Sequence, residues 1–209
     1  MKHDVTMQKL KPKAVRPGSD TLIAIGSSAG GPAALATVLG GLPKDLPAAI
    51  VIVQHVDERM AQGMAEWLAQ QCVLPVRVAK EGDQPTLGVV LLAKTSDHLI
   101  FKTSVRLGYT AEPRDYVHRP SVDAFFQSVC RWWEGDVIGV LLTGMGRDGA
   151  LGLKALRDQG RSTIAQDEES CAVYGMPKAA AALSAAVDIL PLTRIASRLV
   201  GLVGIRRFV

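Results

Sequence analysis

Residues 48–53 and 137–142 are apolar or glycine at every position, with no alternation between apolar and polar side chains. Runs of this length and character are typical of strands that are covered on both faces in a parallel sheet. A similar run at 21–25 leads through a small-residue turn into a segment with helical periodicity. This pattern predicts an α/β fold with a doubly wound, mainly parallel sheet, helices on both faces and right-handed crossovers.

Weaker patterns complete the expected order of elements. Short strands are expected at 76–79, 88–93, 99–102, 163–165 and 187–190. An antiparallel hairpin at one edge of the sheet is expected to include residues 106–112. Helices are expected from 32, through 60–68, from 121, and over 151–157, 177–186 and 194–203. Because no repeat or domain boundary follows residue 20, we expect one domain at 21–205 after a basic flexible arm or linker remnant at 1–20.

The charge distribution bears on the class of partner. The formal net charge is +4, and residues 1–19 hold five basic residues against one acidic residue, so the arm accounts for the whole excess. The balanced remainder argues against a nucleic-acid partner. No run resembles a signal peptide or approaches the length of a membrane span, so we expect a cytoplasmic protein with no direct membrane insertion.

The three cysteines, Cys72, Cys130 and Cys171, are an odd number without metal-ligand spacing. Each lies near apolar residues, where a reduced cysteine packs as a small hydrophobic side chain. The sequence therefore predicts no structural disulfide, no metal site and no cofactor.

Three chemically useful residues follow predicted buried strands. Ser28, His55 and Asp148 each lie just beyond the carboxyl end of a strand, where open parallel sheets bind ligands. A serine hydroxyl becomes a good nucleophile when a histidine accepts its proton, and a carboxylate then orients the histidine. The three residues are thus candidates for a catalytic triad.

The turn around Ser28 supports this interpretation. Residues 26–30 fit the G-x-S-x-G pattern of a nucleophile elbow between a strand and a helix, with Ser28 at the centre. The backbone N–H of Ala29 and the N-terminus of the following helix could stabilise an oxyanion.

Other interpretations of the same residues stay open at this point. The glycine-rich turn could bind a phosphate or nucleotide, although it lacks a Walker lysine and the G-x-G-x-x-G spacing. His55 could be a structural residue, and Asp148 could cap the helix that begins at Gly149. The chain order Ser, His, Asp also differs from that of ordinary α/β-hydrolases.

Over about residues 20–200 the sequence resembles the CheB family of chemotaxis protein-glutamate methylesterases. The motifs that carry the resemblance lie at 25–31, 53–55, 118–123, 142–150 and 165–177. The resemblance implies that Ser28 attacks a glutamyl methyl ester, that His55 is general base and then acid, and that Asp148 orients His55. It also implies deamidation of receptor glutamines through the same acyl intermediate.

The resemblance further implies partners and secondary site residues. The substrate would be the cytoplasmic helices of a methyl-accepting receptor, and family members usually carry a receiver domain before the esterase domain. Ala29, Met145 and Arg119 are expected at the oxyanion site or the active-site rim, with Ser121 near the rim or capping a helix. Ala29 stands where many members have threonine. A signalling scaffold that keeps the fold without activity is the remaining alternative.

Overall fold

The computed structural model describes residues 20–94 and 96–205. The predicted basic arm, except for its last residue, lies outside the described residues. No helix in the described ranges is long and apolar enough to cross a membrane.

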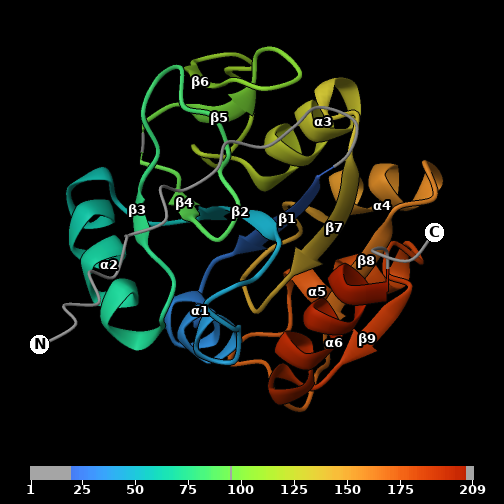
Figure 1. The fold of residues 1–209 in the computed structure, drawn as a ribbon. Coiled ribbons are helices and arrows are strands. Elements are labelled where there is room, and N and C mark those ends of the chain that lie inside the picture. Colours follow the sequence, from blue (N-terminus) through green and yellow to red (C-terminus); the bar gives the residue numbers. More distant parts are fainter. Residues whose placement is uncertain (1–19, 95, 206–209) are drawn as a thin grey trace, which may run out of the picture.

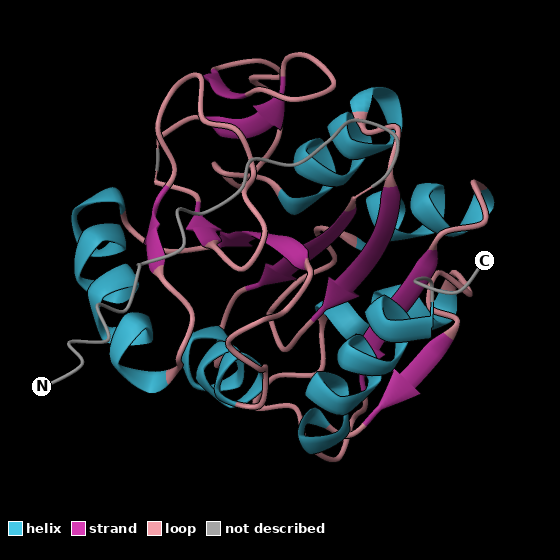
Figure 2. Cartoon of the chain, in the orientation of Figure 1, coloured by secondary structure: helices cyan, strands magenta, loops and turns pink. Residues whose placement is uncertain are grey.

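The main sheet has seven parallel strands in the order β3-β4-β2-β1-β7-β8-β9 (Figures 1 and 2). Their bounds are β1 Thr21–Ser27, β2 Ala48–Gln54, β3 Val76–Val78, β4 Val90–Leu92, β7 Asp136–Leu141, β8 Ser162–Gln166 and β9 Asp188–Leu190. Strands β2, β4 and β3 lie on one side of β1, and strands β7, β8 and β9 lie on the other side. The strand order therefore has its switch point at β1. A crevice at such a switch point is where this fold class binds ligands.

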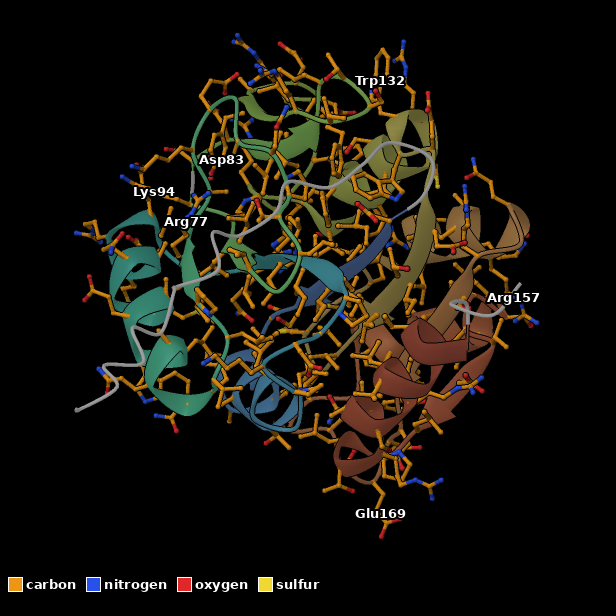
Figure 3. The ribbon with its side chains drawn as sticks, in the orientation of Figure 1. Arg77, Asp83, Lys94, Trp132, Arg157 and Glu169 are labelled. Atoms are coloured by element: carbon orange, nitrogen blue, oxygen red, sulfur yellow. The ribbon has the colours of Figure 1, made fainter. Side chains whose placement is uncertain are left out.

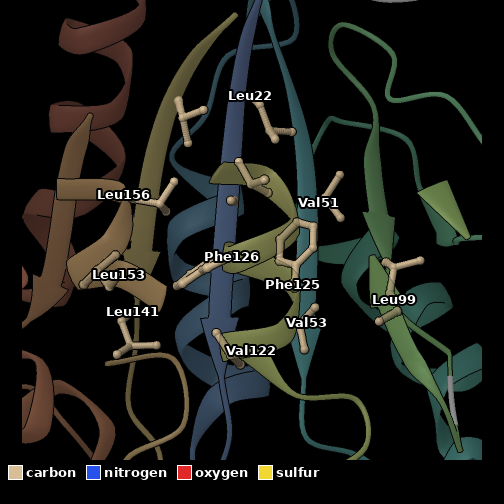
Figure 4. Close-up of a cluster of buried hydrophobic side chains, with 14 of the residues drawn as sticks. Leu22, Val51, Val53, Leu99, Val122, Phe125, Phe126, Leu141, Leu153 and Leu156 are labelled. Atoms are coloured by element: carbon tan, nitrogen blue, oxygen red, sulfur yellow. The ribbon is translucent and has the colours of Figure 1, made fainter. Parts of the chain in front are cut away.

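Helices cover both faces of this sheet, which confirms the predicted doubly wound architecture. The helices are α1 Gly31–Gly40, α2 Glu58–Gln71, α3 Val122–Trp132, α4 Ala150–Asp158, α5 Met176–Ala182 and α6 Leu192–Ile205. Side chains of α1, α2 and α6 pack with Ile23, Ile25 and Ile52 on one face. Side chains of α3, α4 and α5 pack with Leu22 and Val51 on the other face. Figure 4 shows Phe125 and Phe126 of α3 lying against β1 and β2.

The antiparallel hairpin is present, formed by β5 His98–Phe101 and β6 Leu107–Thr110. It is a separate two-stranded sheet and does not extend the main sheet. The backbone N–H of Phe101 donates to the buried Ser128 hydroxyl of α3 at 2.9 Å, which holds the hairpin against that helix.

The main boundary difference is at α5, which ends at Ala182 and not at the expected residue 186. Ser184 takes a positive φ of 50°, which breaks the helix, and Ala185 and Ala186 turn into the core. Arg157 of α4, labelled in Figure 3, donates to the carbonyl oxygens of Ser184 and Ala186 and so fixes this turn. An alanine-rich pattern alone could not reveal that contact.

The first turn of α3 is seated in a space that two glycines leave open. A Cβ atom on Gly26 would lie 2.2 Å from Val122 Cγ1, and one on Gly149 would lie 2.6 Å from the same atom. Gly26 lies near the end of β1, two residues before the candidate nucleophile, and Gly149 has a φ of +87° that favours glycine. Val122 therefore locks α3 onto the loops that carry Ser28 and Asp148.

We predict that Gly26→Ala lowers the free energy of unfolding by about 1–3 kcal/mol, because the added methyl overpacks against Val122. In Gly26→Ala/Val122→Ala the space is restored, so the double variant should lose less than the sum of the single losses. Urea denaturation of the four chains measures this coupling. Gly63→Ala in α2 is the matched control, since nothing lies within 4 Å of its added Cβ. Strictly additive losses would contradict the packing account.

Candidate active site

Ser28, His55 and Asp148 follow three strands that lie side by side, β1, β2 and β7. The imidazole Nε2 of His55 lies 2.8 Å from Asp148 Oδ2, and the two side chains are 11% and 9% exposed. The backbone N–H of His55 donates to the Ser27 carbonyl at 3.0 Å, which brings His55 beside the nucleophile turn. The three residues thus follow adjacent strands at one edge of the sheet.

The other ring nitrogen of His55, Nδ1, has different surroundings from Nε2. Nδ1 is buried and has no hydrogen-bond partner in the part of the chain that the structure describes. Buried polar atoms are nearly always paired, so an unpaired one points to a group that arrives from outside or to a proton transfer. With Nε2 on Asp148, Nδ1 is the nitrogen available as a base.

A buried glutamine connects the nucleophile turn to the histidine. Gln54, the last residue of β2, is 2% exposed. Its Nε2 donates to the carbonyl of Ser28 at 2.9 Å and to the carbonyl of His55 at 2.8 Å. Its Oε1 accepts from the Ser27 hydroxyl at 2.6 Å. One side chain therefore fixes the backbones of both candidate residues.

The turn is also held from the β7 side. Ser28 donates its N–H to the Thr143 carbonyl at 3.0 Å, and the Thr143 hydroxyl donates to the Ala29 carbonyl at 2.9 Å. The Thr143 N–H in turn donates to the buried side chain of Gln166 at 2.9 Å. Gly30 adopts a φ of 78°, and α1 begins at the next residue with a proline in its first turn. This is the geometry expected of an elbow that exposes the Ser28 side chain.

Asp148 does cap a helix, but the helix is α3 and not α4. Its carboxylate accepts from the backbone N–H of Val122 at 2.7 Å and of Asp123 at 3.0 Å, and from the Ser121 hydroxyl at 2.8 Å. Burial alone would raise the pKa of Asp148. The hydrogen bonds from His55, the two backbone N–H groups and Ser121 outweigh burial, and its net pKa is lowered. The group facing His55 is therefore a carboxylate at neutral pH.

Asp123 makes the reciprocal contact. It lies in α3, and its Oδ1 accepts from the Gly152 N–H in the first turn of α4 at 2.7 Å. Burial, together with the negative charge of Asp148, raises the pKa of Asp123 to about 6. Asp148 thus caps the helix that contains Asp123, and Asp123 caps the helix that follows Asp148.

His118 stacks on His55, with ring centroids 4.1 Å apart and an angle of 18° between the planes. Burial, and then the neighbouring His55, lower the pKa of His118, which favours its neutral form. The two rings cover each other, so His118 shields one face of the imidazole and limits its rotation. His118 and Ser121 also line an open cleft of about 390 Å³ whose other lining residues are Asp115, Tyr116, Val117, Asp123, Gly146, Arg147, Asp148 and Leu151.

The sequence alone does not assign a functional role to Gln54, His118 or Asp123. His118 and Asp123 lie in the 118–123 motif that carries part of the resemblance, and Gln54 lies in the 53–55 motif. The position of these residues within the motifs was the signal in the sequence that could have indicated a role at the site. Their contacts join residues distant in sequence, such as Gln54 with Ser28, Asp123 with Gly152 and His118 with His55, and no sequence spacing reveals these.

The structure places the remaining candidates as follows. Ala29 is exposed at the elbow, and Met145 is 72% exposed on the loop after β7. Arg119 is exposed, and its guanidinium donates to the Arg114 carbonyl at 2.7 Å, a contact within its own loop. Ser121 is the N-cap of α3, as expected, and accepts from the Ala124 N–H.

Cys171 and metal chemistry need only brief description. Burial raises the pKa of the Cys171 thiol to about 11, so it is not a thiolate at neutral pH. In the described ranges, no group of three or more His, Cys, Asp or Glu is arranged to hold a metal ion.

Comparison with known proteins identifies the family. The model of the CheB methylesterase family matches residues 23–199. The chain belongs to the CheB methylesterase family. The crystal structure of the CheB methylesterase catalytic domain of Thermotoga maritima matches with a TM-score of 0.84 and 34% identity, covering 88% of this chain and 99% of that one.

Curated relatives of this CheB-family chain carry one name. A protein of Cupriavidus metallidurans, named protein-glutamate methylesterase/protein-glutamine glutaminase 2, is 64% identical over 184 residues, which are 88% of this chain and 54% of the relative. The protein of that type from Mesorhizobium japonicum is 58% identical over 90% of this chain and 56% of its own length. The chain therefore spans about half the length of these relatives.

The Asp123 carboxyl gives a prediction of pH-dependent stability. An unperturbed aspartate loses its proton near pH 3.8, whereas Asp123 in the folded chain keeps it to about pH 6. The resulting stabilisation is present at low pH and is lost as the pH rises from 3.8 to about 6. Asp123→Asn removes this titration and still accepts from Gly152, so its stability relative to the parent should increase as the pH rises through this window.

Urea denaturation at a series of pH values from acid to neutral measures this difference. The exposed Asp45→Asn is the control and should track the parent at each pH. A stability difference between Asp123→Asn and the parent that does not vary with pH would contradict the raised pKa.

Proposed function

We propose that the chain hydrolyses glutamate 5-O-methyl esters on methyl-accepting receptor proteins, giving glutamate and methanol, with Ser28, His55 and Asp148 as catalytic triad. The observation that carries the proposal is the 2.8 Å contact of His55 Nε2 with an ionised Asp148 beside the Ser28 elbow, with Nδ1 left without a partner. The names of the relatives support the same reaction.

The first half of the reaction forms an acyl-enzyme. The Ser28 oxygen attacks the ester carbonyl while His55 Nδ1 accepts the hydroxyl proton. The resulting imidazolium is stabilised by Asp148 through Nε2, because that carboxylate is held ionised by α3. Negative charge develops on the carbonyl oxygen, where the Ala29 N–H and the N-terminus of α1 stabilise it. His55 then gives its proton to the leaving methanol.

The second half regenerates the enzyme. Water attacks the acyl carbonyl, His55 Nδ1 takes one of its protons, and that proton returns to the Ser28 oxygen as the bond to glutamate breaks. An amide follows the same path with ammonia as leaving group, so the same site would deamidate receptor glutamines. Met145 and Arg119 are proposed at the rim, Met145 beside the oxyanion and Arg119 holding its own loop. No step needs a metal or an organic cofactor.

The proposed partner is the helical cytoplasmic part of a methyl-accepting receptor, and the proposed location is the cytoplasm. In the longer relatives a receiver domain is the expected neighbour of this catalytic domain. We propose that the arm at 1–20 corresponds to the connection between the two.

The triad is tested by methanol release from a methylated receptor cytoplasmic fragment. Ser28→Ala and His55→Ala should each lower turnover by roughly 10⁶-fold, because nucleophile and base act as a unit. Asp148→Asn should lose about 10⁴-fold, because the amide no longer fixes the productive tautomer. Release by the parent that survives in Ser28→Ala would exclude Ser28 as nucleophile. No release by a folded parent would favour a non-catalytic scaffold.

We expect Gln54 to affect the rate of the reaction only by positioning the loops that carry Ser28 and His55. In Gln54→Glu the side chain keeps its shape but loses the two donors to the carbonyls of Ser28 and His55. A displacement of about 1 Å between nucleophile and base costs roughly 10²-fold in rate, so kcat should fall by that factor with little change in KM. Gln70→Glu, an exposed position on α2, is the matched control. Wild-type kcat in a folded Gln54→Glu would show that the two loops are positioned by other contacts.

A further inference from the structure

A second groove continues the active-site cleft across the surface of α4 and α5. Its volume is about 350 Å³, and it is lined by Asp123, Arg147, Ala150, Leu151, Ala179, Ala182 and Leu183. Asp123, Arg147 and Leu151 line both hollows. A ligand that lies in the cleft beside Asp148 and His118 can therefore extend into the groove without leaving the surface.

Apart from Asp123 and Arg147, the residues that line the groove are apolar. Three alanines line it, and the two leucines at its sides are exposed, Leu151 by 62% and Leu183 by 40%. Small residues let another backbone approach closely, and burial of the exposed leucines by a partner favours binding. Neither leucine is part of the buried core, whereas Ala150 belongs to it and Ala179 packs against it.

Arg147 marks the junction of the two hollows. Its guanidinium makes no hydrogen bond or ion pair with any of the described residues. Lys154, a nearby cation on α4, is by contrast paired with Asp158. The aspartates of the cleft, Asp115, Asp123 and Asp148, surround the approach to the triad with acidic groups. A partner carboxylate is consequently repelled inside the cleft and attracted at Arg147.

We propose that this groove, together with Arg147, binds the substrate helix that carries the methylated glutamate. The inference rests on the proposed function and names how its substrate is recognised. The neutral ester enters the cleft, a free carboxylate of the same helix pairs with Arg147, and apolar residues of that helix lie between Leu151 and Leu183.

One face of a helix can carry the methyl ester, the free carboxylate and the apolar side chains together. Residues three, four and seven positions apart lie on the same side, and each turn advances about 5.4 Å. A segment whose glutamates are methylated only in part presents free carboxylates one or two turns from the ester. Amphipathic helices bind in apolar grooves in this way, with side chains at such spacings as contacts.

Binding is separated from chemistry by using the Ser28→Ala chain. The Kd of this chain for a methylated receptor cytoplasmic fragment is measured by calorimetry, and further variants are made in the same background. Arg147→Glu should raise Kd by roughly tenfold, because an attractive charge pair becomes a repulsive one. Leu183→Asp should raise it to a similar extent by placing a charge against apolar side chains. Both positions are exposed, so the fold should persist, and circular dichroism checks this.

Lys44→Glu is the matched control. Lys44 is exposed and precedes β2, at the edge of the sheet opposite to the triad, so the same change of charge should leave Kd unaltered. Acidic residues of the fragment are then changed to lysine one at a time. At least one such fragment should bind Arg147→Glu better than the unchanged fragment does, which identifies the pairing carboxylate.

The outcomes are distinct. Weaker binding in both groove variants, with rescue by one lysine substitution, supports the proposal. The proposal is overturned if Kd is unchanged in either groove variant, or if the loss of affinity equals that of Lys44→Glu. Absence of methanol release by the parent chain would refute the proposed function while the Kd values still report on the groove.

Discussion

The carboxylate of Asp148 joins two parts of the chain that are far apart in sequence, the first turn of α3 and the imidazole of His55. It accepts from the Val122 and Asp123 N–H groups and from Ser121 on one side, and contacts His55 Nε2 on the other. A helix N-terminus favours a nearby negative charge, and each donor lowers the cost of keeping that charge buried. The same interaction therefore fixes a helix of the fold and supplies the charge that orients the candidate base.

The position of α3 depends in turn on close packing at the switch point of the sheet. Val122 fills the space beside Gly26 of β1 and Gly149 before α4, and Gln54 ties the loop after β2 to the loop after β1. Strands β2, β1 and β7 are adjacent, so their carboxyl ends deliver Ser28, His55 and Asp148 to one place. A displacement at any of these contacts would move the triad residues relative to one another, because the contacts join the loops that carry them.

Much of this arrangement could be predicted from sequence because it depends on local patterns. The uninterrupted apolar runs indicated buried parallel strands, and residues just after such strands indicated the site edge. The contacts that could not be predicted depend on three-dimensional packing. Asp148 was considered as a cap of the adjacent helix, whereas it caps α3, whose first turn lies some 26 residues earlier in the chain. The stacking of His118 on His55 and the end of α5 at Ala182 are decided in the same way, by residues distant in sequence.

The charges of the cleft suit a reaction that turns a neutral group into an anion. At neutral pH Asp148 is ionised, and Asp123, with a pKa of about 6, is largely ionised as well. A methyl ester carries no charge and enters beside them without repulsion, whereas the glutamate that the proposed reaction releases is repelled by both. Product release is favoured by the same carboxylates that hold α3, α4 and His55 in place. Below about pH 6 Asp123 becomes neutral, so its contribution to product release weakens.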